Sequence, residues 1–260
     1  MQTKDINFHI SELDSMKKYP DSLYYIGDTS LLERKKISIV GSRKPNQYAR
    51  AKTEELARKL SQAGLCIVSG GALGVDAIAH SSAGTNNTIV VAATGLDKRY
   101  PTINASLIGE VEERGLVISQ FKDKTPSTKY NFVIRNEVVV ALGDVLIVTY
   151  ADLKSGTMRS VEFALKMGKK IYVLAHRIGE SEATNKLLVE GKAEAIYDID
   201  SFVKKFSKIE VKIEKKSDLF LEFCQSNPSY EEAVSKFPTR VFEAELSGEI
   251  EIKNSRVFIL

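Results

Sequence analysis

The stretch IVSGGALGVDAIAH, residues 67–80, joins a short apolar run to a glycine-rich turn and then to a helix-like pattern. An apolar run of this kind is typical of a strand that is buried on both faces of a sheet. Glycines between a strand and a helix allow the backbone to come close to another group. The turn therefore has the form of a binding loop for a dinucleotide, a free nucleotide or the phosphates of a nucleic acid.

The same strand-turn-helix unit recurs along the chain from Lys36 onward. Runs rich in β-branched residues alternate with helix-like stretches, most of which end in glycine, the usual residue after a helix. This alternation predicts an α/β fold, a Rossmann-like and mostly parallel sheet with helices on both faces. The seven expected strands lie at residues 36–41, 65–69, 88–93, 116–119, 145–150, 170–175 and 195–198.

A second, smaller domain is expected at the carboxyl end. The charged stretch SKIEVKIEKK, residues 207–216, is weakly patterned and typical of a linker. Three helix-like segments follow it, and then a hairpin that turns at Asn254 and Ser255, an order typical of a winged helix. The sequence thus predicts a Rossmann-like domain over residues 1–206 with a short N-terminal lead, and a winged-helix-like domain over residues 217–260.

The composition is that of an ordinary globular protein, with 260 residues of which 43% are hydrophobic and 27% charged. No apolar run approaches the roughly 20 residues that a membrane helix needs, and the first residues lack the apolar core of a signal peptide. Cys66 and Cys224 form neither a CxxC pair nor a metal-ligand spacing. We therefore expect a cytoplasmic protein with buried thiols and no membrane partner.

The net charge of +3 is distributed unevenly. Residues 217–260 hold eight acidic and four basic side chains, a net charge of −4, which leaves +7 on the remainder. A basic body and an acidic tail are compatible with two different roles, and also with two ordinary solvated surfaces. Charge alone favours the second interpretation.

Sheets of this type bind ligands at the carboxyl ends of their strands. Loops rich in glycine, hydroxyl groups and cations follow four expected strands, at residues 41–45, 69–74, 94–101 and 151–158. Helix N-termini attract anions through free N–H groups and the helix dipole, and Arg and Lys pair with phosphate directly. Each loop alone also fits ordinary turn chemistry, but three donor-rich loops at one edge favour phosphate binding. The candidate residues are Arg43, Lys44, Ser69, Gly70, Gly71, Lys154, Ser155, Gly156 and Thr157.

The stretch KYNFVIRNE, residues 129–137, interleaves cations with aromatic rings. Lys129, Phe132 and Arg135 supply the chemistry that single-stranded nucleic acid needs, because a cation meets the backbone and a ring stacks on a base. The alternative is that Phe132 packs in the core and Arg135 pairs with a nearby acid. The pattern alone leaves these two interpretations open.

Other functional classes have weaker support in the sequence. Neither GxGxxG nor the Walker motif GxxxxGK[ST] is present, so NAD binding and ATP hydrolysis are disfavoured. Asp76 and His80 are four residues apart on one helical face, which fits a structural hydrogen bond better than a catalytic dyad. We therefore predict no catalytic residues, no metal and no cofactor.

Taken together, the motifs GSR, SGGALGVDAIAH, TGLDKRYP, FVIRN, KSGTM and EGKA resemble, in this order, those of the DNA-processing protein family DprA, also called Smf. They span most of residues 19–206, and the chain resembles a short, epsilonproteobacterial form. The resemblance implies a protein that binds incoming single-stranded DNA during natural transformation, protects it and helps to load the recombinase RecA. It also implies a homodimer, a phosphate-binding role for Arg43, and the family's lysine and base-stacking ring at Lys129 and Phe132.

Some positions depart from the family pattern, among them Leu73 in place of a loop arginine and Glu137 in place of the last arginine of RNR. A rival class is an enzyme, because KSGTMRSVEFA faintly resembles the GGxGTxxE motif of the Lonely Guy phosphoribohydrolases. In that case Gly156, Thr157 and, at a different spacing, Glu162 would form a nucleotide-cleaving site.

Overall fold

The computed structural model of the chain describes residues 2–207 and 219–259. It divides into two compact units, Met1–Glu210 and Val211–Leu260, which are treated separately. The expected linker at residues 207–216 lies, apart from Ser207, outside the described residues.

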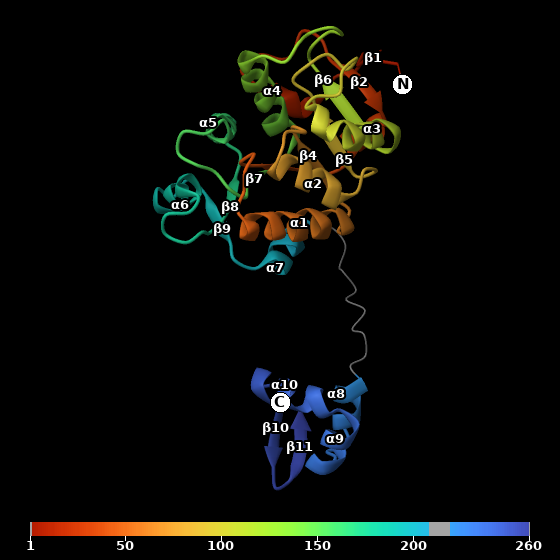
Figure 1. Ribbon diagram of the computed structural model, residues 1–260, viewed down its shortest axis with the longest axis vertical. Helices are drawn as coiled ribbons and strands as arrows, with labels where there is room; N and C mark the ends of the chain where they lie inside the picture. The colour runs from red at the N-terminus through yellow and green to blue at the C-terminus, as the bar shows by residue number, and fades with distance from the viewer. Residues whose placement is uncertain (1, 208–218, 260) are drawn as a thin grey trace. The chain divides into compact units, whose positions relative to one another are not determined.

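The first unit contains a nine-stranded sheet in the order β1-β2-β6-β5-β4-β3-β7-β8-β9 (Figure 1). All seven expected strands are present, and neighbours among them pair in parallel. The prediction of a Rossmann-like sheet is therefore confirmed. The parallel strands are β3 (Lys36–Val40), β4 (Cys66–Ser69), β5 (Thr88–Val91), β6 (Leu116–Ser119), β7 (Leu146–Val148), β8 (Ile171–Leu174) and β9 (Glu194–Ile196).

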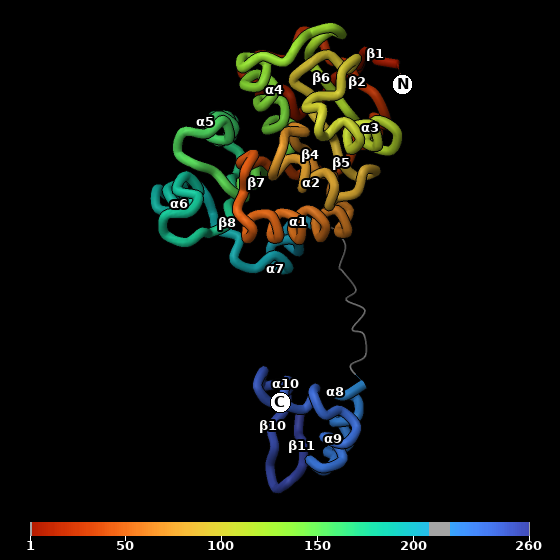
Figure 2. Tube along the Cα trace, in the orientation of Figure 1, coloured from red at the N-terminus to blue at the C-terminus, as the bar shows by residue number. Residues whose placement is uncertain are grey.

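The N-terminal lead adds two strands that the sequence analysis does not predict. Strand β2 (Tyr24–Gly27) pairs antiparallel with β6, and β1 (Lys4–Asp5) pairs antiparallel with β2. The tube in Figure 2 shows this first part of the chain beside β6, far from it in sequence. Both strands are too short to give a clear alternation of apolar and polar residues, which explains why the pattern missed them.

Two layers of helices cover the sheet. The apolar core on one face includes residues of α4 (Lys129–Leu142), α5 (Thr157–Lys166) and α6 (Glu182–Val189). The core on the other face includes residues of α1 (Gln47–Gln62), α2 (Val75–Ala83) and α7 (Ile199–Lys204). A smaller apolar cluster includes residues of α3 (Ala105–Arg114). The 3-10 turns are η1 (Ser11–Ser15), η2 (Thr29–Glu33) and η3 (Thr102–Asn104).

Helix α4 begins earlier than the sequence pattern indicates. The helix-like pattern in this part of the sequence is NEVVVALG, residues 136–143, whereas α4 starts at Lys129. The Thr128 hydroxyl accepts a hydrogen bond from the backbone N–H of Asn131 at 3.1 Å and caps the helix. The cation-rich stretch KYNFVIRNE is therefore the first two turns of a helix.

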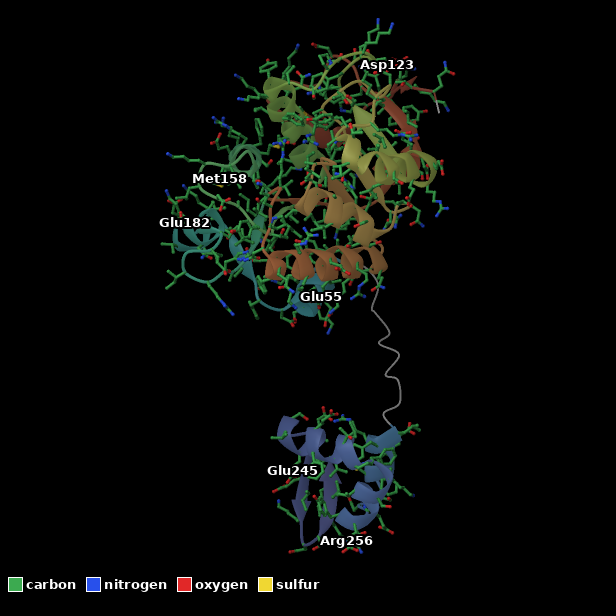
Figure 3. All side chains as sticks on the ribbon, viewed as in Figure 1. Glu55, Asp123, Met158, Glu182, Glu245 and Arg256 are labelled. Atoms are coloured by element: carbon green, nitrogen blue, oxygen red, sulfur yellow. The ribbon has the colours of Figure 1, made fainter. Side chains whose placement is uncertain are left out.

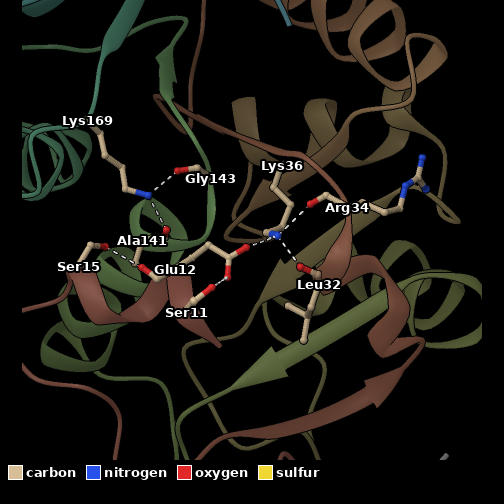
Figure 4. Close-up of polar contacts among 9 residues, drawn as sticks. All are labelled: Ser11, Glu12, Ser15, Leu32, Arg34, Lys36, Ala141, Gly143 and Lys169. Atoms are coloured by element: carbon tan, nitrogen blue, oxygen red, sulfur yellow. Dashed lines mark hydrogen bonds and ion pairs between the residues drawn. The ribbon is translucent and has the colours of Figure 1, made fainter. Parts of the chain in front are cut away.

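A buried polar network fixes the opposite end of α4, at the amino ends of the strands (Figure 4). Lys169 Nζ donates to the carbonyls of Ala141 and Gly143, at 2.5 Å each, where α4 ends. Lys36 Nζ, which is 3% exposed at its side chain, lies 2.5 Å from Glu12 Oε1 and ties η1 to β3. Burial raises the pKa of Glu12, but the hydrogen bonds that its carboxylate accepts and the positive charge of Lys36 together outweigh burial and hold that pKa below its usual value.

The second unit holds three helices and a hairpin, in the order expected of a winged-helix-like domain. The helices are α8 (Leu219–Cys224), α9 (Tyr230–Lys236) and α10 (Pro238–Ser247), and the strands are β10 (Ile250–Lys253) and β11 (Arg256–Ile259). Asn254 and Ser255 both have positive φ angles, 50° and 60°, as a tight hairpin turn requires. Phe220, Val241 and Val257 are at the centre of its own apolar core.

Among the described residues, no helix is both long and apolar enough to cross a membrane.

Candidate nucleic-acid interface

A cavity of about 370 Å³ opens at the carboxyl edge of the sheet. Its walls come from the loops after β3 and β4, from one face of α4 and from the beginning of α5. We call it the edge cavity. It is lined by Val40, Gly41, Ser42, Arg43, Gly70, Ala72, Asp76, Phe132, Arg135, Asn136, Val139, Ser155, Gly156, Thr157 and Ser160.

The edge cavity brings together seven of the twelve predicted site residues. These are Arg43, Gly70, Phe132, Arg135, Ser155, Gly156 and Thr157. Three others, Lys44, Lys129 and Lys154, are exposed and do not line the cavity. Ser69 and Gly71 are buried, and the Ser69 hydroxyl donates to the carbonyl of Ile39 at 2.6 Å.

Helix α4 presents one face to the edge cavity. Phe132, Arg135, Asn136 and Val139 follow the spacing i, i+3, i+4, i+7, which places them in one line along the helix. Lys129 lies one turn before Phe132 on the same face, at the exposed start of the helix. The sequence analysis did not find Asn136, although this helical spacing would have pointed to it.

Phe132 is half-buried at the edge cavity. Its ring centroid lies 5.3 Å from the guanidinium carbon of Arg43 and 5.8 Å from that of Arg135. The centroid of the Tyr100 ring lies 5.9 Å from that of Phe132, the two rings are tilted against each other, and Tyr100 is 43% exposed. Phe132 and Arg43 thus form a cation-π pair at the cavity wall, and Tyr100 is an aromatic neighbour that the sequence analysis left out of its candidates.

Arg135 was predicted as a DNA-contacting cation, with pairing inside the protein as the alternative, and the structure buries it. Only 4% of the residue is exposed. Its Nη1 donates to the carbonyl of Gly70 and to that of Val91, the latter at 2.8 Å, and its Nε donates to Asn136. Burial lowers the pKa of the guanidinium. Arg135 therefore holds the glycine loop from inside the protein.

The glycine loop needs its glycines for close packing. A Cβ atom at Gly70 would lie 1.9 Å from Arg135 Nη1. Gly74 has a φ of +78°, and a Cβ there would lie 2.4 Å from the carbonyl oxygen of Ser42. Glycine at these two positions therefore lets Arg135 and the loop that carries Arg43 approach the turn. The sequence alone indicates that such glycines allow a close approach, and the structure identifies the groups that approach.

Polar groups of the glycine loop already have partners within the protein. The backbone N–H of Ala72 donates to Asp76 Oδ2 at 3.3 Å. The side chain of Asn104 donates to the carbonyls of Gly71 and Ala72, at 3.0 and 3.1 Å. Burial raises the pKa of Asp76, and the nearby Arg135 guanidinium partly opposes this. The loop acts as a fixed wall of the edge cavity.

The beginning of α5 is more open. Gly156 precedes the helix, no side chain caps it, and a Cβ at Gly156 would meet nothing within 4 Å. The Ser155 hydroxyl is buried and has no hydrogen-bond partner within the described residues. An uncapped helix N-terminus with a free hydroxyl beside it is suited to an anion.

The structure supports the structural role expected for His80. Its Nδ1 lies 2.7 Å from Thr88 Oγ1, which ties α2 to β5. The rival enzymatic motif is not assembled, because Glu162 is exposed, lies 2.8 Å from Arg159 and is absent from the residues that line the edge cavity.

The fold and the edge cavity define a Rossmann-like protein whose carboxyl sheet edge combines cations, an aromatic ring and an open helix N-terminus. The chain belongs to the DNA recombination-mediator protein A family, whose sequence model matches residues 3–207.

Similar proteins are known by sequence. Protein Smf of Synechocystis is 33% identical over 184 residues, which are 68% of this chain and 46% of that protein. Protein Smf of Escherichia coli is 30% identical over 192 residues, which are 72% of this chain and 51% of that protein. The chain thus spans about half the length of these curated relatives.

Two solved structures share the fold. DNA processing protein A from Helicobacter pylori is 41% identical, with a TM-score of 0.77 over 78% of this chain and 95% of that one. That structure concerns its mode of binding single-stranded DNA. The Streptococcus pneumoniae protein is 29% identical, with a TM-score of 0.73 over 79% of this chain and 74% of that one.

Proposed function

We propose that this chain binds single-stranded DNA in the edge cavity and passes it to the recombinase RecA, as a mediator of recombination during natural transformation. The observation that carries the proposal is the meeting of Arg43, Phe132 and the open start of α5 around one cavity. The family, and the single-stranded DNA bound by the Helicobacter pylori relative, support the same ligand.

In this proposal the parts of the edge cavity have separate tasks. The N-terminus of α5 and the Ser155 hydroxyl receive a phosphate, and Arg43 contacts the neighbouring backbone. A base stacks on the platform made by the Phe132 ring and the Arg43 guanidinium. Lys129, at the exposed start of α4, attracts the strand as it enters.

Two buried residues, Arg135 and Asp76, hold this platform in place. Arg135 contacts the Phe132 ring and the Gly70 carbonyl, and Asp76 binds the loop at Ala72. We therefore assign Arg135 a positioning role and leave direct phosphate contact to Arg43 and Lys129.

Fluorescence anisotropy with labelled oligo-dT tests the binding step. We expect binding in EDTA without any nucleotide, because the chain has neither a Walker motif nor GxGxxG. Affinity should fall steeply with salt, as phosphate contacts release counterions. An absolute requirement for magnesium or ATP would contradict the proposal, and release of a free base from a nucleoside monophosphate would favour the rival enzyme.

The transfer of single-stranded DNA to RecA needs its own test. We propose that the protein acts as a homodimer and speeds the assembly of RecA on single-stranded DNA. Assembly on DNA covered by a single-strand-binding protein should be faster when this protein is added, and light scattering should give the mass of a dimer. Unchanged assembly kinetics would limit the function to DNA binding.

A further inference from the structure

A second cavity, of about 460 Å³, opens at the same edge of the sheet. It lies between the start of α1 and the loop after β8, and we call it the Tyr48 cavity. The loop after β3 gives Arg43 to the edge cavity and Asn46 to this one, so one loop borders both. The Tyr48 cavity is lined by Asn46, Gln47, Tyr48, Ala175, His176, Arg177 and Glu180.

The loop after β8 has a fixed conformation. Asn185 Oδ1 accepts from the backbone N–H of His176 at 3.1 Å, and Asn185 Nδ2 donates to the carbonyls of His176 and Glu180 at 3.1 and 3.2 Å. The Ser181 hydroxyl accepts from the backbone N–H of Ala151 at 2.9 Å. A wall held at this many points is suited to present side chains in defined positions.

His176 fixes the floor of the Tyr48 cavity. Its Nε2 lies 2.8 Å from the carbonyl oxygen of Thr149, which can only accept, so Nε2 carries the proton. Its ring meets the rings of Tyr48 and Tyr150 edge-on, with centroids 5.4 and 5.2 Å apart. These contacts hold the Tyr48 ring while leaving 44% of that residue exposed.

The exposed groups repeat the chemistry of the edge cavity. In the edge cavity the aromatic ring is Phe132 and the cation is Arg43. In the Tyr48 cavity the ring is Tyr48 and the cation is the exposed Arg177. Glu180 also lines the Tyr48 cavity, but its carboxylate accepts from Asn46 Nδ2 at 3.1 Å. A phosphate is therefore expected on the side of Arg177, away from Glu180.

We propose that the Tyr48 cavity is a second nucleotide subsite for the same DNA strand, in which a base stacks on Tyr48 and Arg177 contacts a phosphate. This inference rests on the proposed function of the edge cavity. Strands β3 and β8 are separated by β7, a distance of about 10 Å across the sheet. About three stacked nucleotides span that distance, so exposed Lys44 would lie beside the connecting backbone.

Oligonucleotide length separates the two subsites. A strand of about 2 nucleotides is shorter than the distance between the two cavities and can occupy only one of them, whereas one of about 16 can reach both. Tyr48→Ala and Arg177→Ala should weaken binding of the longer oligo-dT by about fivefold or more and leave the shorter one unchanged. Tyr48→Phe, which keeps the ring, and Arg58→Ala, an exposed cation elsewhere on α1, are the matched controls and should behave like the wild type.

A direct readout comes from the absence of tryptophan in the chain. Tyr48→Trp introduces the only indole, and stacking of a base on it should quench its fluorescence when the longer oligo-dT binds. Quenching should saturate at the concentration where anisotropy saturates.

The outcomes distinguish this inference from the function on which it rests. If the wild type binds oligo-dT and Arg43→Ala weakens both lengths, the edge cavity is the DNA site. If Tyr48→Ala and Arg177→Ala then bind the longer strand like the wild type, and Tyr48→Trp is not quenched, the second subsite is wrong. A wild type that binds neither length would overturn both.

Discussion

At the scale of single residues, Gly70 and Arg135 depend on each other. The guanidinium fills the space that a Cβ at Gly70 would occupy, and it donates to the Gly70 carbonyl. The sequence predicts a glycine turn at residues 69–74 and gives Arg135 as a candidate DNA contact, but it cannot show that Arg135 is the reason for the glycine. That relation joins residues 65 positions apart and exists only in the folded chain.

Because of this dependence, alanine substitutions at two glycines of the edge cavity should have different effects on stability. Gly70→Ala should lower the free energy of unfolding by about 1–3 kcal/mol, because its Cβ collides with a buried side chain. Gly156→Ala should change it by less than about 0.5 kcal/mol, because the space beside Gly156 is open. Thermal unfolding of both variants gives the comparison, and equal stabilities would refute the packing argument.

His80 should make stability depend on pH. Thr88 Oγ1 donates to the Ile67 carbonyl at 2.8 Å, so it accepts from His80 Nδ1. Burial, with the nearby Arg135, lowers the pKa of His80 from 6.5 to about 3. Below pH 6.5 the unfolded chain binds a proton that the folded chain does not, so this stability is lost as the pH falls toward 3.

The expected loss is roughly 2 kcal/mol between pH 6.5 and about pH 5. His80→Gln should remove this part of the pH dependence, whereas the exposed His9→Gln should keep it. Urea unfolding at the two pH values measures the difference. If wild type and His80→Gln lose stability in parallel, the imidazole is not held neutral.

At the scale of elements, α4 supports the site from both ends. Its first turns carry Lys129, Phe132 and Arg135, and its last carbonyls are bound by Lys169. The seven parallel strands were predictable because each lies in a short run that is rich in apolar and β-branched residues and is bounded by turn residues. The start of α4 was missed although Thr128 is a local capping residue. The strands β1 and β2 were not predictable, because the pairing of β2 with β6 and of β1 with β2 depends on tertiary context.

Lys169→Met should reduce stability without changing the DNA site. The variant keeps the length of the side chain but leaves the carbonyls of Ala141 and Gly143 without their donor. A loss of about 1.5–3 kcal/mol is expected for a hydrogen bond to a charged group. Lys166→Met, an exposed change on α5, is the control, and chemical denaturation is the measurement. A variant as stable as the control would show that the network does not anchor α4.

At the scale of the whole molecule, the two units differ in charge and in exposed chemistry. The last helix of the second unit, α10, exposes Glu243 and Glu245, the second of which is labelled in Figure 3. It also exposes Phe242 (51%) and Leu246 (90%). Carboxylates repel phosphates, and apolar groups gain from contact with protein. The sequence showed the acidic tail, while the structure adds the exposed apolar pair.

We therefore expect the second unit to contact protein and to add nothing to DNA affinity. A chain that ends at Ser207 keeps the apolar cores of the first unit. It should bind oligo-dT and a short duplex as tightly as the full chain at low salt, where electrostatic attraction is greatest. Anisotropy titrations of both chains give the answer. Weaker duplex binding after the truncation would assign the tail a role in DNA recognition.

Arg43 and Phe132 are proposed to bind one strand of DNA by different forces, and the salt dependence of oligo-dT binding separates the two contributions. Arg43→Ala should weaken binding and reduce the log-log slope against salt by about 0.7 for each lost phosphate contact. Phe132→Ala should weaken binding by about 1–3 kcal/mol, keep the slope of the wild type and remain folded. If both variants bind with the affinity and slope of the wild type, the edge cavity is not the site of DNA binding.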